Sequence, residues 1–296
     1  MDRYDFIINV YCLVCEYYQI IKERYRIRRG GFAPALTDEE VITIEICGEY
    51  FKMNRDQDIF DYFQAHYQAD FPHLRERTLF VRQAANLWQV KAAIQQLLVI
   101  HSGQADDPVQ AIDTLPLPVC VYTRAPRDRC FKPVADYSHC AAKKMDYYGF
   151  KLGLRIARSG MITYYPLLPA RPHDIQFLEE LVENFAGTVP ADKGFIDTTR
   201  QALLQERQGV AVITPARKNM VETQPLQVRR LCSRWRKRIE TVGSQLTERF
   251  AIDHIRVRDL WHFQHRVIRK VLAHTIGVFL NLQLGRKPLD LDGLFA

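Results

Sequence analysis

Hydrophobic residues recur at helical spacing through the first third of the chain. The repeats predict four helices, over residues 4–28, 38–53, 56–67 and 76–100. Thr37-Asp38-Glu39-Glu40 predicts a capping box at the start of the second helix, since Thr and Glu three residues apart can satisfy each other's backbone amides. Residues 1–104 are therefore expected to form an all-α region.

The pattern changes after the polar segment at residues 102–108, which predicts a boundary. Short apolar runs predict strands over 109–115, 119–123, 188–191 and 210–214, and Ser159-Gly160 predicts a hairpin between 147–157 and 161–168. Helical patterns cover 173–185, 197–208, 226–250 and 262–282. Strands that alternate with helices in this way indicate an α/β domain over residues 109–285.

The helix expected at 226–250 carries an acid beside its apolar stripe. The stripe consists of Leu231, Trp235, Ile239, Val242, Leu246 and Phe250, and Glu240 lies about 100° around the helix from it. The upstream half is rich in cations: Arg229, Arg230, Arg234, Arg236, Lys237 and Arg238. A solvated charged face would explain any one of them, but the cluster beside Glu240 indicates an acidic site held against a polyanion such as DNA.

Three acids follow or end predicted elements at comparable positions. Asp113 ends the first strand, Asp192 follows the strand at 188–191, and Glu240 lies on the helix after the last strand. Each alone could be a turn or capping residue. Together they are expected to converge on one edge of the sheet, where hard oxygen ligands suit Mg²⁺ or Mn²⁺. Two such ions in one site are the usual device for phosphodiester chemistry.

Further cations stand close to predicted strands and strand ends. They are Lys144, Lys151, Lys193, Arg217 and Lys218. Around a metal site such residues could neutralise DNA phosphates, although each one singly is better explained as part of a solvated surface.

Composition adds a modest argument in the same direction. The chain has 41 basic and 34 acidic residues, a net charge of +7, which favours an anionic partner. Seven scattered cysteines indicate reduced thiols rather than a disulfide framework. The apolar run at 275–284 is too short to span a bilayer, and the start lacks a signal peptide pattern. We expect a soluble cytoplasmic protein with no membrane partner.

Six segments in order resemble the DDE-type transposases of bacterial insertion sequences. They are IDTLPLPVC around Asp113, KKMDYYGFKLGL at 143–154, LPARPHD at 168–174, ADKGF around Asp192, TPARKNM at 214–220 and RKRIETVGSQLTERF at 236–250. The resemblance covers roughly residues 109–280. It implies a ribonuclease H-like mixed sheet flanked by helices, with Asp113, Asp192 and Glu240 as catalytic residues that bind two divalent ions.

The same resemblance implies a function and partners. We expect cleavage at the ends of an insertion sequence, where terminal inverted repeats lie, and transfer of the 3′-hydroxyl to target DNA. A homodimer in the DNA complex is expected, in a bacterial cytoplasm and on the nucleoid when DNA is bound.

One motif departs from the family. In many relatives it reads Tyr, two residues, Arg, three residues, Glu, six residues, Lys; here Ser233 and Thr247 take the Tyr and Lys places, while Arg236 and Glu240 fit. The missing Lys puts a terminal phosphate contact in doubt. Two alternatives stay open: a metal-dependent nuclease that does not join DNA, and a catalytically silent DNA-binding repressor.

The N-terminal helices leave a second choice open. Arg75, Arg77 and Arg82 stand near the entry of the helix at 76–100, which suits a helix-turn-helix-like DNA module. An ordinary helical bundle explains the same pattern equally well. Residues 1–104 are thus a candidate DNA-binding region.

Overall fold

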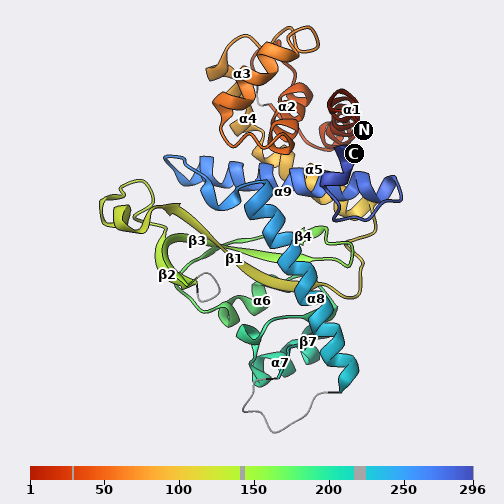
Figure 1. Cartoon of the computed structure of the whole chain (residues 1–296), viewed down its shortest axis with the longest axis vertical. Helices are drawn as coiled ribbons and strands as arrows, with labels where there is room; N and C mark the ends of the chain where they lie inside the picture. The colour runs from red at the N-terminus through yellow and green to blue at the C-terminus, as the bar shows by residue number, and fades with distance from the viewer. Residues whose placement is uncertain (29, 141–143, 217–224, 296) are drawn as a thin grey trace. The chain divides into compact units, whose positions relative to one another are not determined.

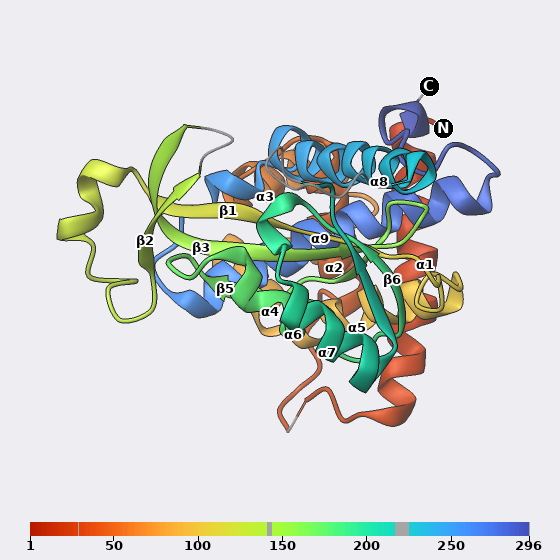
Figure 2. The ribbon, with the colours of Figure 1, turned by 90° about the horizontal axis from the view of Figure 1, so that it is seen from below.

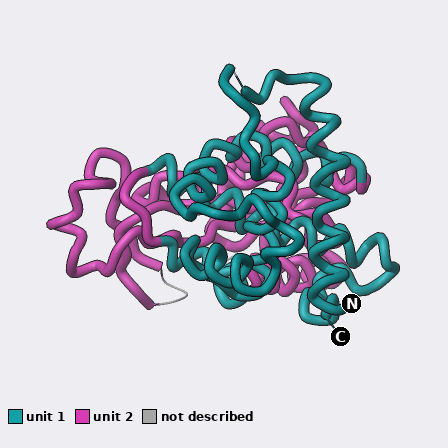
Figure 3. The backbone as a smooth tube through the Cα atoms, turned by 90° about the horizontal axis from the view of Figure 1, so that it is seen from above, with its two compact units in different colours: residues 1–101, 246–255, 260–296 teal, residues 102–245, 256–259 magenta. Residues whose placement is uncertain are grey.

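The chain folds into two compact units, which Figure 3 shows in different colours. The computed structural model describes residues 1–28, 30–140, 144–216 and 225–295. Unit 1 combines residues 1–101, 246–255 and 260–296, and unit 2 combines residues 102–245 and 256–259. The sequence-based division into a DNA-binding region (1–104) and a catalytic domain (109–285) assigns functions to the two parts, and these assignments stay predictions. The compact units differ from it because the last long helix packs among the N-terminal helices.

Unit 1 is helical (Figure 1). Its long helices are α1 (Arg3–Arg24), α2 (Asp38–Tyr50), α3 (Asp56–His66), α4 (Arg77–Asn86), α5 (Trp88–His101) and α9 (Leu260–Gln283). The predicted capping box is confirmed: the Glu40 amide donates to Thr37 Oγ1 at 3.2 Å, and the Thr37 amide donates to Glu40 Oε2 at 2.7 Å. The single helix expected at 76–100 is interrupted at Leu87, so it forms α4 and α5.

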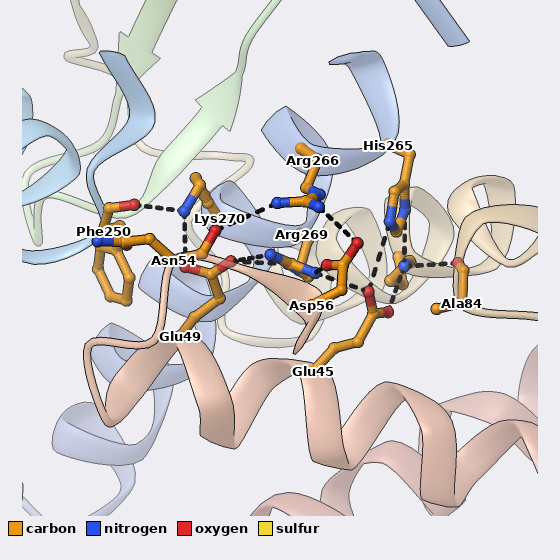
Figure 4. Close-up of polar contacts among 11 residues, drawn as sticks. Glu45, Glu49, Asn54, Asp56, Ala84, Phe250, His265, Arg266, Arg269 and Lys270 are labelled. Atoms are coloured by element: carbon orange, nitrogen blue, oxygen red, sulfur yellow. Dashed lines mark hydrogen bonds and ion pairs between the residues drawn. The ribbon is translucent and has the colours of Figure 1, made fainter. Parts of the chain in front are cut away.

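A network of buried charges lies inside unit 1 (Figure 4). Arg269 of α9 donates to Glu49 Oε1 at 2.7 Å and to Glu45 Oε1 at 3.0 Å. Lys91 of α5 donates to Glu45 Oε2 at 2.5 Å, and Lys270 donates to Glu49 Oε2 at 2.8 Å. All five side chains are at most 2% exposed. Buried charges require such pairing, so the network ties α2 and α5 to α9.

Unit 2 is built on an antiparallel sheet. β1 (Ala111–Cys120) and β2 (Asp136–Cys140) flank β3 (Met145–Ile156), and two short strands, β4 (Ile162–Tyr164) and β5 (Leu167–Pro169), also pair with β3. In this register Asp113 lies opposite Leu154. Two parallel strands, β6 (Gly187–Pro190) and β7 (Val210–Ile213), form a second ladder.

The residues that lead into β1 join the two ladders. Val109 bridges Thr188 in parallel, the Gln110 amide donates to the Thr188 carbonyl at 3.0 Å, and the Thr188 amide donates to the Pro108 carbonyl at 2.8 Å. The strands therefore follow the order β2-β3-β1-β6-β7, antiparallel on one side of β1 and parallel on the other. This mixed sheet confirms the expected ribonuclease H-like α/β fold.

Helices pack against this sheet (Figure 2). α8 (Leu226–Ser244) contacts β1 and β6, α7 (Thr198–Gln208) contacts β7, and the short α6 (Leu178–Leu181) contacts β3. A buried hydrophobic cluster packs α6 against the sheet and includes Ile112, Leu178, Leu181 and Val189.

Two predicted elements of unit 2 differ from the structure. Residues 119–123 do not form a strand of their own, since β1 runs on to Cys120 and a 3₁₀ turn (Tyr122–Arg127) follows. β1 tolerates Pro116 and Pro118 because its named strand partner is β3 alone, so their missing N–H groups break no second ladder among the described residues. The helix expected at 173–185 is shorter in the structure: a 3₁₀ turn (Asp174–Phe177) is followed by α6, which ends at Leu181. Asn184 has a φ of 53°, so a regular helix does not continue to residue 185.

No helix in the described part of the chain has both the length and the apolar character needed to cross a membrane.

Candidate active site

The three acids singled out from the sequence border one cavity in unit 2. The cavity has a volume of about 470 Å³, and Asp113, Asp192 and Glu240 all line it. They come from β1, from the segment after β6 and from α8, so the fold gathers residues that lie far apart in the sequence. Their catalytic role stays a prediction.

Asp113 is held on the central strand. Ile112 beside it belongs to the buried cluster, and side-chain alternation along a strand turns Asp113 to the opposite face. The Thr114 amide donates to Asp113 Oδ1 at 2.8 Å. The pKa of Asp113 is raised to about 7, mainly by burial and to a smaller extent by the negative charges of Asp192, Asp174 and Glu240, against the opposing effect of the Thr114 hydrogen bond. The Asp113 carboxyl therefore lies in a desolvated and strongly acidic environment.

Asp192 is placed by the parallel ladder. The Ala191 amide donates to the Ile213 carbonyl at 3.0 Å, which extends the β6–β7 pairing to the residue before it. The Phe195 amide donates to the Asp192 carbonyl at 3.0 Å and starts the 3₁₀ turn Lys193–Phe195. The Asp192 side chain is 47% exposed, so it is accessible to a ligand in the cavity.

Glu240 is placed by the apolar stripe of α8. Cys232, Trp235, Ile239 and Val242 are buried, and this fixes the rotation of the helix and leaves Glu240 at the cavity rim, 55% exposed. Ile239 and Val242 belong to the apolar stripe predicted from the sequence. Because this stripe is buried, Glu240 lies beside it on an exposed part of the helix, as predicted.

Arg236 lies between two of the acids. Its Nε donates to Glu240 Oε1 at 2.8 Å, and its Nη1 is 3.7 Å from Asp192 Oδ1. The hydrogen bond with Glu240 and the charge of Asp192 raise the pKa of Arg236. The guanidinium thus neutralises part of the charge that the carboxylates bring together.

A fourth carboxylate, Asp174, belongs to the same cavity. Lys151 of β3 donates to Asp174 Oδ1 at 2.8 Å and to the Pro172 carbonyl at 2.7 Å. In the sequence, His173-Asp174 stands at the start of the helix expected at 173–185, where a capping role is the simplest interpretation. A 3₁₀ turn does begin there, but the His173 side chain makes no capping hydrogen bond. One feature of the sequence indicates this contact: Lys151 lies between Phe150 and Leu152 in a strand, and a partly buried lysine needs an acidic partner.

The remaining predicted DNA contacts fall into three groups. Exposed side chains belong to Lys144 before β3, Lys193 beside Asp192, and three α8 residues, Arg229, Arg234 and Lys237. Lys151 and Arg238 have partners inside unit 2: Arg238 donates to the Arg158 carbonyl, and its guanidinium lies 5.6 Å from the Trp235 ring centroid. Arg217 and Lys218 lie outside the described residues. Contact with DNA stays a prediction for every member of the set.

The donor set of the cavity suits a divalent cation. Four carboxylates and two strong cations, Lys151 and Arg236, line it, so an ionised site carries excess negative charge. Carboxylate oxygens are the ligands that Mg²⁺ and Mn²⁺ prefer. The described residues contain no close group of three acidic, histidine or cysteine side chains already arranged as ligands. The carboxylates repel one another, and among the described residues of the cavity only Lys151 and Arg236 compensate their charge, which is consistent with acids that line the same cavity without close contact.

Comparisons with known proteins give one result. The family model described as "Transposase DDE domain" matches residues 103–260, which is more than half of the chain and contains all four cavity carboxylates. No curated protein and no solved structure matches the chain significantly.

Proposed function

This chain belongs to the family of transposases with a DDE domain, and from that premise we propose that it cuts DNA at the ends of the element that encodes it and joins the resulting 3′-hydroxyl to target DNA. One observation supports the proposal above all others. Asp113, Asp192 and Glu240, from three separate segments, border one cavity, and the charges of the other two raise the pKa of Asp113.

The three carboxylates would hold divalent cations. Asp113, Asp192 and Glu240 supply hard oxygen donors, and two Mg²⁺ or Mn²⁺ ions bound there would supply the Lewis acidity that phosphodiester cleavage and strand transfer require. Asp113 must lose its proton to serve as a ligand. Its raised pKa means that a divalent cation would have to compete with this proton for the Asp113 carboxylate.

Other residues of the cavity would orient the acids and the substrate. Arg236 fixes the carboxylate of Glu240 and lies within 3.7 Å of Asp192, and Lys151 fixes Asp174. The exposed cations Lys193, Arg234 and Lys237 stand on the elements that carry two of the acids, and they would contact phosphates on either side of the scissile bond. Their role is positioning, because phosphate contacts set the register of DNA without reading its sequence.

The oligomeric state is part of the proposal. Two element ends must be processed together for an element to move, so we expect a homodimer when both ends are bound. Residues 1–104, the predicted DNA-binding region, are the candidate for recognition of the terminal repeats.

The test is cleavage of DNA that carries the sequences flanking its own gene, with Mg²⁺ or Mn²⁺ against EDTA. The intact protein should cut only with the cation, and Glu240→Gln should bind the same DNA without cutting it. Appearance of joined products on a second duplex separates a transposase from a nuclease that does not join DNA. Binding without cutting by the intact protein under all these conditions would instead support the silent repressor.

A further inference from the structure

A lobe between β1 and β2 carries a surface that the proposed chemistry does not use. This β1–β2 lobe consists of residues 121–135 and includes the 3₁₀ turn Tyr122–Arg127. It belongs to unit 2, and Figure 2 shows it as a projection at one end of the sheet, where the chain passes from β1 to β2. The chain returns from it into β2, whose last residues, His139 and Cys140, line the candidate active site. The lobe and the cavity are therefore joined by one short strand.

The lobe is an ordered structure with a small core of its own. Phe131 is 2% exposed, and its ring packs edge-on against Phe150 of β3 with centroids 6.2 Å apart. Ala125 and Ala135 are also buried. The Asp128 carboxylate accepts hydrogen bonds from the amides of Cys130 and Phe131, at 3.1 and 3.2 Å, and closes the turn. These contacts fix the backbone that carries the outer side chains of the lobe.

Four of those outer side chains are cations. Arg124, Arg127, Arg129 and Lys132 are all exposed. In the described part of the chain none of the four forms an ion pair with an acid. The one acid within the lobe, Asp128, accepts backbone hydrogen bonds instead. Four cations against the single acid Asp128 give the lobe a net positive charge.

Exposed aromatic rings lie on the same lobe and on the strand that follows it. The ring centroid of Tyr137 on β2 is 4.9 Å from that of buried Tyr148 and 5.6 Å from that of Tyr122, which stands edge-on to it. Tyr122 and Tyr137 are each 46% exposed, and Val121 is 63% exposed. An aromatic ladder anchored at one end and open at the other offers ring surface on which a planar group can stack.

Cations and exposed rings together suit one class of partner. A protein partner that covered Tyr122 and Tyr137 would have to supply acids for four cations, whereas a nucleic acid supplies a regular phosphate chain and bases with π-faces. We propose that the β1–β2 lobe binds the DNA next to the cleavage site, with its arginines and lysine on phosphates and Tyr122 and Tyr137 stacked on a base exposed at a strand end. The inference rests on the proposed function for the identity of the polymer and adds a site to it.

The phosphate contacts are tested by the salt dependence of binding to an unrelated 30-base-pair duplex. Arg124→Ala with Arg127→Ala should lower the slope of log K against log salt by about 2, since each lost phosphate contact accounts for about 0.9. Arg207→Ala with Arg256→Ala removes the same charge from exposed positions of unit 2 outside the lobe and should leave the slope unchanged. Equal slopes for the two double variants would overturn the proposal.

The stacking contact is tested with duplexes that end bluntly or in a short unpaired overhang. Intact protein should prefer the overhang, and Tyr137→Leu should reduce that preference about fivefold or more, because one base stacked on an aromatic ring contributes that much or more. Tyr137→Phe keeps the ring and should retain the preference. Loss in both variants, or in neither, would contradict stacking.

Failure of this inference can be told apart from failure of the proposed function. If the intact protein cuts DNA in a metal-dependent way and the lobe variants bind DNA unchanged, the DNA-binding role of the lobe is rejected and the proposed transposase function is retained. Absence of any DNA binding by the intact protein would reject both.

Discussion

Arg236 donates a hydrogen bond from Nε to Glu240 Oε1 at 2.8 Å, one helical turn away on α8. The same guanidinium lies 3.7 Å from Asp192 Oδ1, so one cation connects acids from two different elements. Arg236 and Glu240 are 57% and 55% exposed, and ion pairs between exposed side chains contribute little to stability. The arrangement is better explained by the site: Arg236 compensates charge where the proposed chemistry would bring in a divalent cation.

Arg236→Gln should therefore change cation binding more than folding. Without the guanidinium the carboxylates repel one another more strongly, and a divalent cation becomes the main source of compensation. We expect a small loss of thermal stability in EDTA and a larger rise in melting temperature on addition of Mn²⁺ than the intact protein shows. Arg229→Gln, near the start of the same helix, is the charge-matched control. A rise equal to that of the intact protein would show that Arg236 does not compete with the cation.

The raised pKa of Asp113 predicts how stability depends on pH when no cation is present. The pKa is about 7 in the folded protein and about 3.8 in the unfolded chain, so the folded state keeps a proton that the unfolded state has lost between these values. The stability contributed by this group is complete below pH 4 and is lost as pH rises to 7, with a slope of up to about 1.4 kcal/mol per pH unit.

Asp113→Asn is the control for that prediction, because the amide cannot titrate and keeps the shape of the side chain. Free energies of unfolding should be measured by urea titration in EDTA from pH 4 to 8 for both proteins. The difference between the two curves isolates Asp113 from the other carboxyl groups. A difference that does not vary with pH would mean that Asp113 titrates normally.

Sequence patterns predicted those parts of the site that periodicity determines. The spacing of Trp235, Ile239 and Val242 sets the rotation of α8, and this alone places Glu240 on an exposed flank. Short apolar runs predict the strand that carries Asp113 and the strand before Asp192. Asp113 does not end its strand, however, because β1 runs from Ala111 to Cys120. The ribonuclease H-like strand order came from the family resemblance and not from any local pattern.

Contacts between distant segments could not be predicted in this way. Asp174 and Lys151 are 23 residues apart, and each alone fits a turn or a charged surface. Arg238 donates to the carbonyl of Arg158, 80 residues before it, and the helical pattern around Arg238 does not indicate this partner. Such outcomes depend on which elements pack together, and the period of a single helix or strand does not contain that information.

Asp174→Asn should shift the pH dependence of DNA cleavage to lower pH. The charge of Asp174 is one of those that raise the pKa of Asp113, so its removal should let Asp113 lose its proton more readily. The midpoint of the cleavage rate against pH, in Mg²⁺, is the quantity to measure. Glu179→Gln removes a carboxylate that pairs with Arg200 at 3.4 Å and does not line the cavity, so it should leave the midpoint in place. An unshifted midpoint for Asp174→Asn would separate Asp174 from the site.

In the buried charge network of unit 1, replacing one partner of an ion pair should destabilise the fold more than replacing both (Figure 4). Lys91→Met leaves Glu45, 1% exposed, without one of its cations, and breaking such a buried pair costs about 3–5 kcal/mol. Adding Glu45→Gln to Lys91→Met removes the uncompensated charge and should recover stability, although Glu45 also accepts a hydrogen bond from Arg269 at 3.0 Å.

Urea unfolding of the four proteins in this cycle measures the coupling between the two residues. Arg55→Met breaks an exposed pair with Asp58, whose side chains are 77% and 37% exposed, and should cost less than about 1 kcal/mol. If Lys91→Met cost no more than Arg55→Met, Lys91 would have to be neutral in the folded protein. Burial lowers its pKa to about 8, so repeating the cycle at pH 7 and pH 9 distinguishes that case, since a neutral Lys91 would give the same cost at both.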